Sequence, residues 1–100
     1  MMQIVFERTG GIMGRKVSLD LDLDEMPADE SATLKRLIDE SDFFDLSDAP
    51  KKTSRLDEFN YTITIITKTI QHTIRISDSS APETLRPLLS ELSKHLKAKR

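Results

Sequence analysis

Apolar and polar residues alternate with a period of two along four segments of the chain, which is the pattern of strands that bury one face. The longest alternation runs from Val17 to Asp24, where four apolar residues take turns with serine and aspartate. The pattern predicts strands over residues 3–9, 16–24, 59–66 and 70–77. The last two segments are separated by a short turn without glycine or asparagine, so we expect a hairpin whose turn is not a primed two-residue turn.

Two other segments repeat apolar residues every three or four positions, as amphipathic helices do. They predict helices over residues 28–41 and 82–97. Pro27 suits the start of the first helix. Ser80 and Glu83 have the spacing of a capping box ahead of the second helix. Pro87 would clash with the turn before it inside a regular helix, so we expect the first turn of this helix to be kinked or separate.

The elements follow the order β-β-α-β-β-α, which is two hairpins each followed by a helix. A four-stranded antiparallel sheet with both helices packed on one face buries every apolar stripe. A length of 100 residues suits one core, so we expect an α+β protein with a single domain over residues 1–100. Residues 45–57 contain a proline and show no period, which predicts a long loop.

The net charge of −2 hides an uneven distribution. Residues 20–48 hold eleven Asp or Glu against two basic residues, whereas residues 86–100 hold five Lys or Arg against one Glu. An acidic flank of this size disfavours nucleic acid and anionic membranes as partners, because both require a dominant basic face. Cysteine is absent, and the sequence shows no signal peptide or membrane span, so we expect a cytoplasmic protein.

The sequence offers no convergent set of catalytic or metal-ligating residues. His72 and His95 are the only histidines. His72 shares its strand face with Ile70 and Ile74, which favours a partly buried structural residue, whereas His95 near a helix end is expected at the surface. No HExxH, EF-hand or GxSxG pattern occurs. We therefore expect a protein that is not an enzyme and has no catalytic residue, metal or cofactor.

All three glycines of the chain, Gly10, Gly11 and Gly14, fall in one five-residue window. No GK[ST] follows, so the window is not a phosphate-binding loop. A hairpin loop that needs positive φ angles accounts for the glycines. It does not account for Ile12 and Met13 between them, because polar residues are usual at the tip of a turn. These two side chains either fold back to cap the core or are offered to a partner.

Four segments together resemble the emfourin family. They are ERTGGIMG, ADESATLKRLIDESDFFDL, FNYTITI and ISDSSAPETLRPLLSEL, in this order. RTGG and the SD-x-x-APE-x-LRPLL run are the specific parts of the resemblance. Emfourins are small bacterial proteins that inhibit thermolysin-like metalloproteases of the protealysin group, so the resemblance implies a non-enzymatic inhibitor whose partner is such a protease. Family members often read TGGFAG at the turn, which puts Ile12 and Met13 at the Phe and Ala positions.

On this resemblance we expect the glycine turn to occupy the active-site cleft of the protease, with its apolar tip in the subsite just after the scissile bond. The expected contact residues are Arg8, Thr9, Gly10, Gly11, Ile12, Met13 and Gly14. Pro50, Lys51 and Lys52 in the long loop are expected to form a secondary contact. The alternative is an interaction module or subunit without inhibitory activity, whose acidic flank docks a basic partner. In either case we expect a monomer when the chain is free.

Overall fold

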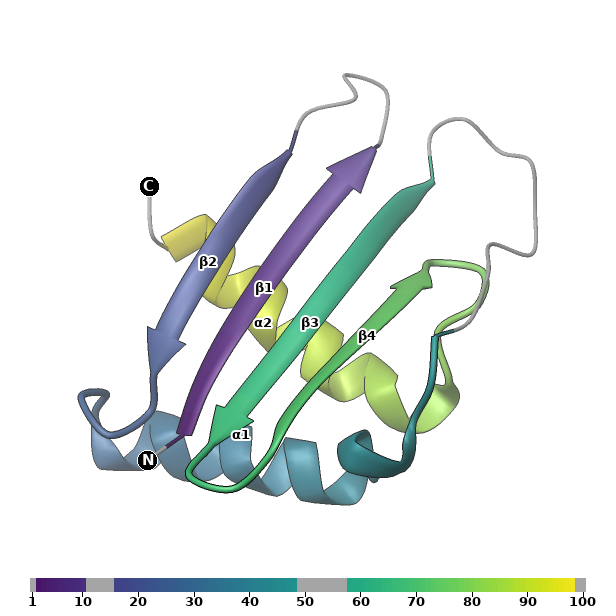
Figure 1. Ribbon diagram of the computed structural model, residues 1–100. Coiled ribbons are helices and arrows are strands. Elements are labelled where there is room, and N and C mark those ends of the chain that lie inside the picture. The colour runs from purple at the N-terminus through teal and green to yellow at the C-terminus, as the bar shows by residue number, and fades with distance from the viewer. Residues whose placement is uncertain (1, 11–15, 49–57, 99–100) are drawn as a thin grey trace.

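The computed structural model describes residues 2–10, 16–48 and 58–98 of the chain. The described residues form one four-stranded antiparallel sheet with two α-helices on one of its faces, which confirms the predicted α+β architecture and element order (Figure 1). The strands are β1 (Met2–Gly10), β2 (Val17–Asp22), β3 (Phe59–Thr67) and β4 (Gln71–Ser77). The helices are α1 (Ala28–Glu40) and α2 (Arg86–Ala98), and the short 3₁₀ turns are η1 (Phe43–Asp45) and η2 (Glu83–Leu85).

The strand order across the sheet is β2-β1-β3-β4, so the two hairpins meet through β1 and β3. These central strands pair antiparallel, with Phe6 opposite Ile63 and Gly10 opposite Phe59. Strand β2 ends at Asp22, two residues before the expected end, because the Glu25 N–H donates to the Asp22 carbonyl at 3.0 Å and turns the chain. The pairing of β1 with β3 therefore brings segments from distant parts of the sequence together.

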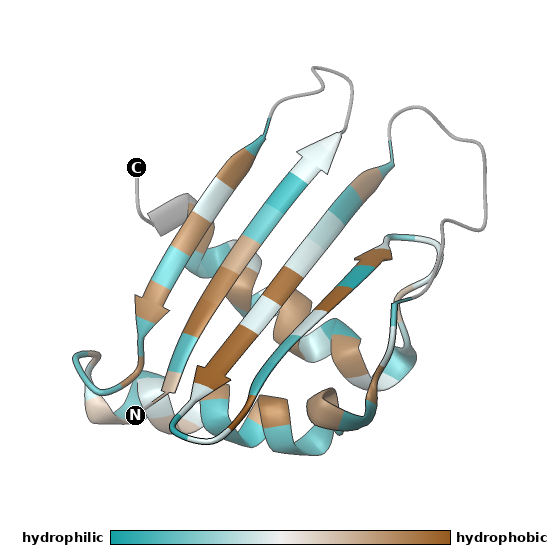
Figure 2. Ribbon diagram, viewed as in Figure 1, coloured by the Kyte–Doolittle hydropathy of each residue, from teal (hydrophilic) through white to brown (hydrophobic). Residues whose placement is uncertain are grey.

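The core lies between the sheet and the helices, where the apolar half of each alternating strand packs. Figure 2 shows the bands of apolar and polar residues along the strands. The predicted stripe of α1 is buried through Leu34, Leu37 and Ile38. Ile70 is an exception, because it lies in the β3–β4 turn and is 50% exposed; the strand alternation placed it wrongly on the buried face. When the alternation of a strand continues into a turn, it no longer shows which residues face the core.

The β3–β4 turn has no primed geometry, as expected from its sequence. Among the described residues the only non-glycine with a positive φ is Asp42, which lies elsewhere, whereas primed turns need positive φ. The Thr67 N–H donates to the Ile70 carbonyl at 2.8 Å, and the Ile70 N–H donates to Thr67 Oγ1 at 3.1 Å. A threonine hydroxyl thus takes a bond that a backbone carbonyl would otherwise accept.

The second helix begins in two steps. The 3₁₀ turn η2 precedes α2, and Pro87 is the second residue of α2, where its missing N–H costs nothing. The expected separate first turn is confirmed. The expected capping box is wrong, because Pro82, and not Ser80, is the N-cap residue of η2, and it makes no side-chain hydrogen bond. Ser80 is instead buried, and its Oγ accepts a bond of 2.9 Å from the Ser77 N–H.

No helix of the described chain covers the other face of the sheet (Figure 1). Side chains on this face bond to one another across the strands. Gln3 donates to Asp20 at 2.7 Å, Thr64 and Thr73 share a bond of 2.8 Å, and Lys16 lies 3.4 Å from Glu7. The sheet therefore has one apolar and one polar face.

Candidate functional site

Both of the specific sequence segments reach the same end of the sheet. At this end β1 and β4 finish and β2 and β3 begin (Figure 1). We call this the loop end, and its described residues are Arg8, Gly10, Glu58, Phe59, Tyr61, Asp78 and Ser79. RTGG supplies the first two and the SD-x-x-APE run supplies the last two. The pairing of β3 with both β1 and β4 is what brings them together.

Gly10 has a backbone conformation and surroundings that only glycine fits. Its φ is +99°, in a region that side chains with a Cβ rarely adopt. A Cβ placed there would lie 2.6 Å from the Glu58 carbonyl oxygen. The first glycine of the window is therefore required by close contact between the end of β1 and the residue that precedes β3.

Asp78 joins the end of β4 to the beginning of β3. One carboxylate oxygen accepts from the Phe59 N–H at 3.0 Å, and the other accepts from the Tyr61 hydroxyl at 2.6 Å. The Asp78 N–H donates to the Phe59 carbonyl at 3.1 Å, and Arg86 donates to the Asp78 carbonyl at 3.2 Å. Both oxygens of the side chain are engaged, so Asp78 has a structural role at this end of the sheet.

Tyr61 donates this bond from a largely buried position. Burial raises the pKa of Tyr61 well above its ordinary value of 10.0, and the hydrogen bond and negative charge of Asp78 raise the pKa further. Its ring stacks on Phe6 with the centroids 5.9 Å apart. Tyr61 therefore remains a neutral hydroxyl donor throughout the neutral pH range.

Glu58 holds the turn that follows β4. Its carboxylate accepts from the Ser79 N–H at 3.0 Å and from the Ser79 hydroxyl at 3.2 Å. The Ser80 and Ala81 N–H groups both donate to the Ser77 carbonyl. Glu58 is buried, and its charge is met by these donors. The serine-rich turn thus stabilises the loop end instead of presenting a nucleophile.

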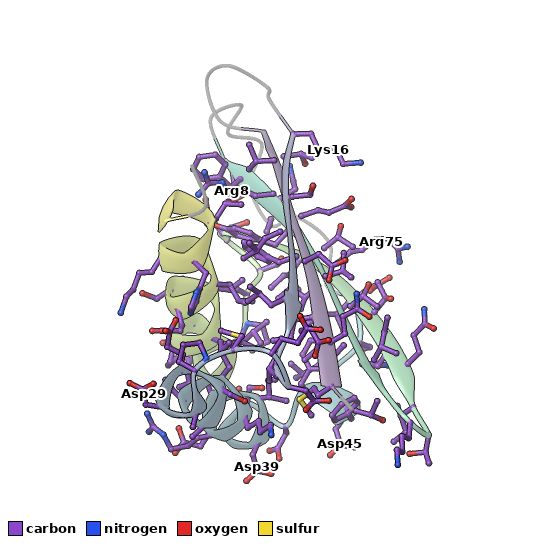
Figure 3. All side chains as sticks on the ribbon, turned by 90° about the vertical axis from the view of Figure 1, so that its left-hand side faces the viewer. Arg8, Lys16, Asp29, Asp39, Asp45 and Arg75 are labelled. Atoms are coloured by element: carbon purple, nitrogen blue, oxygen red, sulfur yellow. The ribbon has the colours of Figure 1, made fainter. Side chains whose placement is uncertain are left out.

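Arg8 lies on the helix side of the sheet at the loop end (Figure 3). Its guanidinium carbon is 4.6 Å from the centroid of the Phe59 ring, which is a cation–π contact. Phe59 in turn lies 6.4 Å from Tyr61. The Phe59 ring therefore supports a planar cation at this end of the sheet.

Comparison with known proteins places all of these residues inside one family match. The model of the emfourin family matches residues 6–93. The chain belongs to the emfourin family. Membership of this family of inhibitors implies a role of the protease-inhibitor type. No curated protein and no solved structure matches the chain.

The emfourin match includes all of the contact residues expected from the sequence. Arg8, Thr9 and Gly10 are described, and they end a central strand at the loop end. Thr9 pairs with Asn60 in the sheet register. The remaining expected contacts lie outside the described residues and stay predictions: Gly11, Ile12, Met13, Gly14, Pro50, Lys51 and Lys52. The segments that contain them adjoin Gly10 and Glu58, which are in close contact.

The anchoring roles of Glu58, Tyr61 and Asp78 were not predicted from the sequence. Asp78 and its serine neighbours stood out only as a resemblance to emfourins and as possible helix caps. Their partners lie about twenty residues away in the sequence, so no local pattern signals the contacts. The sequence feature that pointed to Asp78 was the SD-x-x-APE segment, one of the specific parts of the resemblance to emfourins.

The two histidines differ in how well the sequence placed them. His72 is partly buried, as expected, with Nε2 2.6 Å from the Leu46 carbonyl oxygen and its ring packed edge-on to Phe43. His95 was expected at the surface but is partly buried, with its side chain 16% exposed between Glu30 of α1 and Glu91 of its own helix. Packing of α2 on α1 covers it. Within the described residues, no group of His, Asp and Glu is placed to hold a metal ion.

A second surface lies at the end of the sheet opposite the loop end. It is a hollow of about 410 Å³ beside the end of α1. It is lined by Met2, Lys35, Ile38, Asp39, Asp42, Phe43, Phe44 and Asp45. Figure 3 shows Asp39 and Asp45 on the side of the molecule away from Arg8. We call it the acidic hollow, because its lining combines three aspartates with four apolar side chains and one lysine. None of the described helices is long and apolar enough to cross a membrane.

Proposed function

We propose that this chain is a cytoplasmic protein inhibitor of a thermolysin-like zinc metalloprotease of the protealysin type, and that it blocks the active-site cleft by protein–protein contact. The observation that carries the proposal is the convergence of the two specific emfourin segments at the loop end. Gly10 meets Glu58 there, and Asp78 joins the adjacent strands. In an inhibitor, both segments would contribute to the same protease-binding end of the sheet.

The mechanism is occupation of the cleft by the segment between β1 and β2. Thermolysin-like enzymes favour a bulky apolar residue just after the scissile bond, and Ile12 or Met13 supplies such a side chain. The flanks of this segment are held, since Arg8 pairs with Val17 and Gly10 pairs with Phe59. Fixed flanks reduce the entropy lost on binding and therefore favour tight inhibition. Pro50, Lys51 and Lys52 precede Glu58 and form the secondary contact.

The chemistry of the loop end supports a binding protein over an enzyme. The carboxylates of Asp78 and Glu58 accept bonds from neighbouring backbone and hydroxyl groups. Tyr61 keeps its proton. A general base or nucleophile needs an available lone pair and access to a substrate. These groups are committed to holding the strands together.

The direct test is a titration of the purified chain against thermolysin cleaving a fluorogenic peptide, repeated with a protealysin-type protease. We expect progressive loss of protease activity that saturates near one inhibitor per enzyme. Unchanged cleavage of the peptide by both enzymes at micromolar chain would contradict the proposal.

The contact segment is tested by replacing Ile12 and Met13 together with aspartate. We expect inhibition to weaken by at least about 100-fold, because charges would enter an apolar subsite. Ile70→Asp is the matched control, since Ile70 is an exposed apolar residue in a turn at the other end of the sheet. Retained inhibition in the double variant, with a normal unfolding transition, would move the interface elsewhere.

A second candidate is an interaction module that docks a basic partner on its acidic flank. The acidic hollow favours it, because its apolar and carboxylate side chains suit a segment with apolar and basic side chains. Calorimetry with a lysine- and leucine-containing peptide tests this function. Binding that is lost in the Asp39→Asn, Asp45→Asn double variant, in a chain that inhibits neither protease, would favour the module.

A further inference from the structure

Arg8 differs from the other arginines that the structure describes in having no polar partner. Arg36 and Arg75 lie 3.7 Å and 3.4 Å from the carboxylates of Glu40 and Asp48. Arg86 donates to the Asp78 carbonyl. Among the described residues, the Arg8 guanidinium lies against the face of the Phe59 ring and makes no hydrogen bond or ion pair. The five N–H donors at the edge of a guanidinium are unused in such a contact.

The described acidic residues of the loop end, and the one that precedes Arg8 in β1, are engaged with other groups. Asp78 accepts from Phe59 and Tyr61 through its two oxygens, and Glu58 binds Ser79. Glu7, the preceding residue in β1, alternates to the other face of the sheet and lies 3.4 Å from Lys16. Among the described residues, therefore, none of these three carboxylates forms an ion pair with Arg8.

The guanidinium is also held in place before any partner arrives. Phe59 lies in the central strand β3, and its N–H is bound by Asp78. Stacking of a guanidinium on a fixed ring restricts the side chain while leaving its hydrogen-bonding edge available. A planar donor edge of this kind matches a carboxylate with two parallel bonds. Arg8 thus has the form of a prepared site for one carboxylate.

The position of Arg8 identifies the source of that carboxylate. Arg8 lies at the loop end, two residues before Gly10, where the proposed inhibitory segment leaves β1. A phosphate backbone is a poor match, because nucleic acid binding needs several cations on one face and this chain has a net charge of −2. A protein surface supplies single carboxylates from Asp and Glu.

We propose that Arg8 forms a two-bond ion pair with an Asp or Glu side chain at the rim of the target protease's cleft. The inference rests on the proposed inhibitor function and adds a residue that selects among targets. A protease with a carboxylate at this rim position is bound, and one with a neutral or basic residue there is bound more weakly. Phe59 is the positioning residue for this contact.

The test measures the inhibition constant against a thermolysin-like protease that the wild-type chain inhibits, in low and high salt. We expect Arg8→Met to weaken inhibition by about 10- to 100-fold in low salt. The loss should shrink in high salt, because salt screens an ion pair that is partly open to solvent. Arg8→Lys keeps the charge without the planar fork and should recover part of the affinity.

Arg36→Met is the matched control, because it removes the same charge from an exposed site on α1. It should change the inhibition constant by less than about twofold. Urea unfolding verifies that each variant is folded. If Arg8→Met destabilises the fold, the decision rests on Arg8→Lys, which should still weaken inhibition by about fivefold or more.

The results that overturn the inference differ in meaning. If folded Arg8→Met inhibits as well as wild type, or if its loss is equal in low and high salt, Arg8 forms no ion pair with the target, and the inhibitor function stands. If Arg8→Met inhibits weakly but folded Arg8→Lys inhibits as well as wild type, the contact needs only a positive charge, and the two-bond geometry is wrong. If the wild-type chain inhibits no thermolysin-like protease, the proposed function fails and this inference fails with it.

Discussion

Single residues at the loop end have requirements that their neighbours in the sequence do not share. Gly10 must have a positive φ and must lack a Cβ. Tyr61 must donate to a carboxylate from a buried position. Arg8 and Phe59 must stack. The loop end is therefore defined at the residue scale by backbone geometry and by directed contacts, and each can be removed by one substitution.

Gly10→Ala should lower the free energy of unfolding by about 2–4 kcal/mol, because it adds strain at positive φ and a contact with the Glu58 carbonyl. Urea denaturation measures the change. Thr9→Ala is the control, since Thr9 has the ordinary conformation of a strand, and it should cost less than about 1 kcal/mol. Equal costs at the two positions would show that the close approach to Glu58 is not restrictive.

Tyr61→Phe should lower the free energy of unfolding by about 1–3 kcal/mol at neutral pH, because the ring stays and the bond to the Asp78 carboxylate is lost. The folded pKa of Tyr61 is raised above its ordinary value of 10.0. The stabilisation that the Tyr61 hydroxyl contributes is therefore complete below pH 10.0 and is lost as pH rises above that value. Ionisation of the unfolded tyrosine is the cause.

The difference in unfolding free energy between wild type and Tyr61→Phe should therefore shrink at about pH 11. Urea denaturation of both proteins at neutral and alkaline pH measures it. Comparison of the two proteins removes the contribution of lysines, which are common to both. A difference that stays constant up to about pH 11 would contradict the raised pKa.

At the scale of elements, the edge strand β4 is covered by the segment after α1. His72 bonds to the Leu46 carbonyl, and Asp48 accepts from the Arg75 N–H at 2.8 Å. An open edge strand can pair with another chain. The segment that follows η1 therefore covers this edge through two side chains, His72 from β4 and Asp48 from the segment itself.

His72→Ala should loosen the packing of this segment on β4 and lower the free energy of unfolding by about 1–3 kcal/mol. It removes the bond to Leu46 and the ring contact with Phe43. Hydrogen exchange of the Arg75 amide should become faster than in wild type. Gln71→Ala is the control, because Gln71 is exposed in the same strand. Unchanged exchange at Arg75 in the His72 variant would show that Asp48 alone holds the segment.

Element types could be predicted from the sequence because one face of each strand or helix is buried. The alternation that ends in Leu23 gave β2, and the stripe through Leu34 gave α1. The alternation could not show where the strand begins, so Ile70 was assigned to the buried face of a strand although it lies in the turn. Nor could it show how the helices cross, which is why His95 was expected at the surface although Glu30 of α1 lies beside it.

At the scale of the whole molecule, the candidate site depends on strand order. The glycine window singled out Gly10 from local composition, and the resemblance to emfourins added Arg8. The partners Glu58 and Asp78 required knowledge that β3 lies between β1 and β4. Strand order follows from packing of the complete sheet, and no short segment encodes it. The fold could therefore be predicted, whereas the contacts of its loop end could not.

The charges of the described surface are also arranged along the molecule. Arg8 and Lys16 lie toward the loop end, whereas Asp39 and Asp45 lie at the opposite end (Figure 3). The acidic end of the molecule repels a negatively charged partner, so such a partner approaches the loop end more readily. This orientation is the one that the ion pair of Arg8 requires.

The central position of β1 constrains the order in which the chain can fold during synthesis. Both neighbours of β1 are made after it, and β3 begins only at Phe59. Until the ribosome has produced β3, the apolar residues of β1 can pair with β2 but cannot complete the sheet. Closure of such a long segment is slow compared with forming a local hairpin. The loop end is consequently assembled late, when the Asp78 turn has emerged and can join β3 to β4.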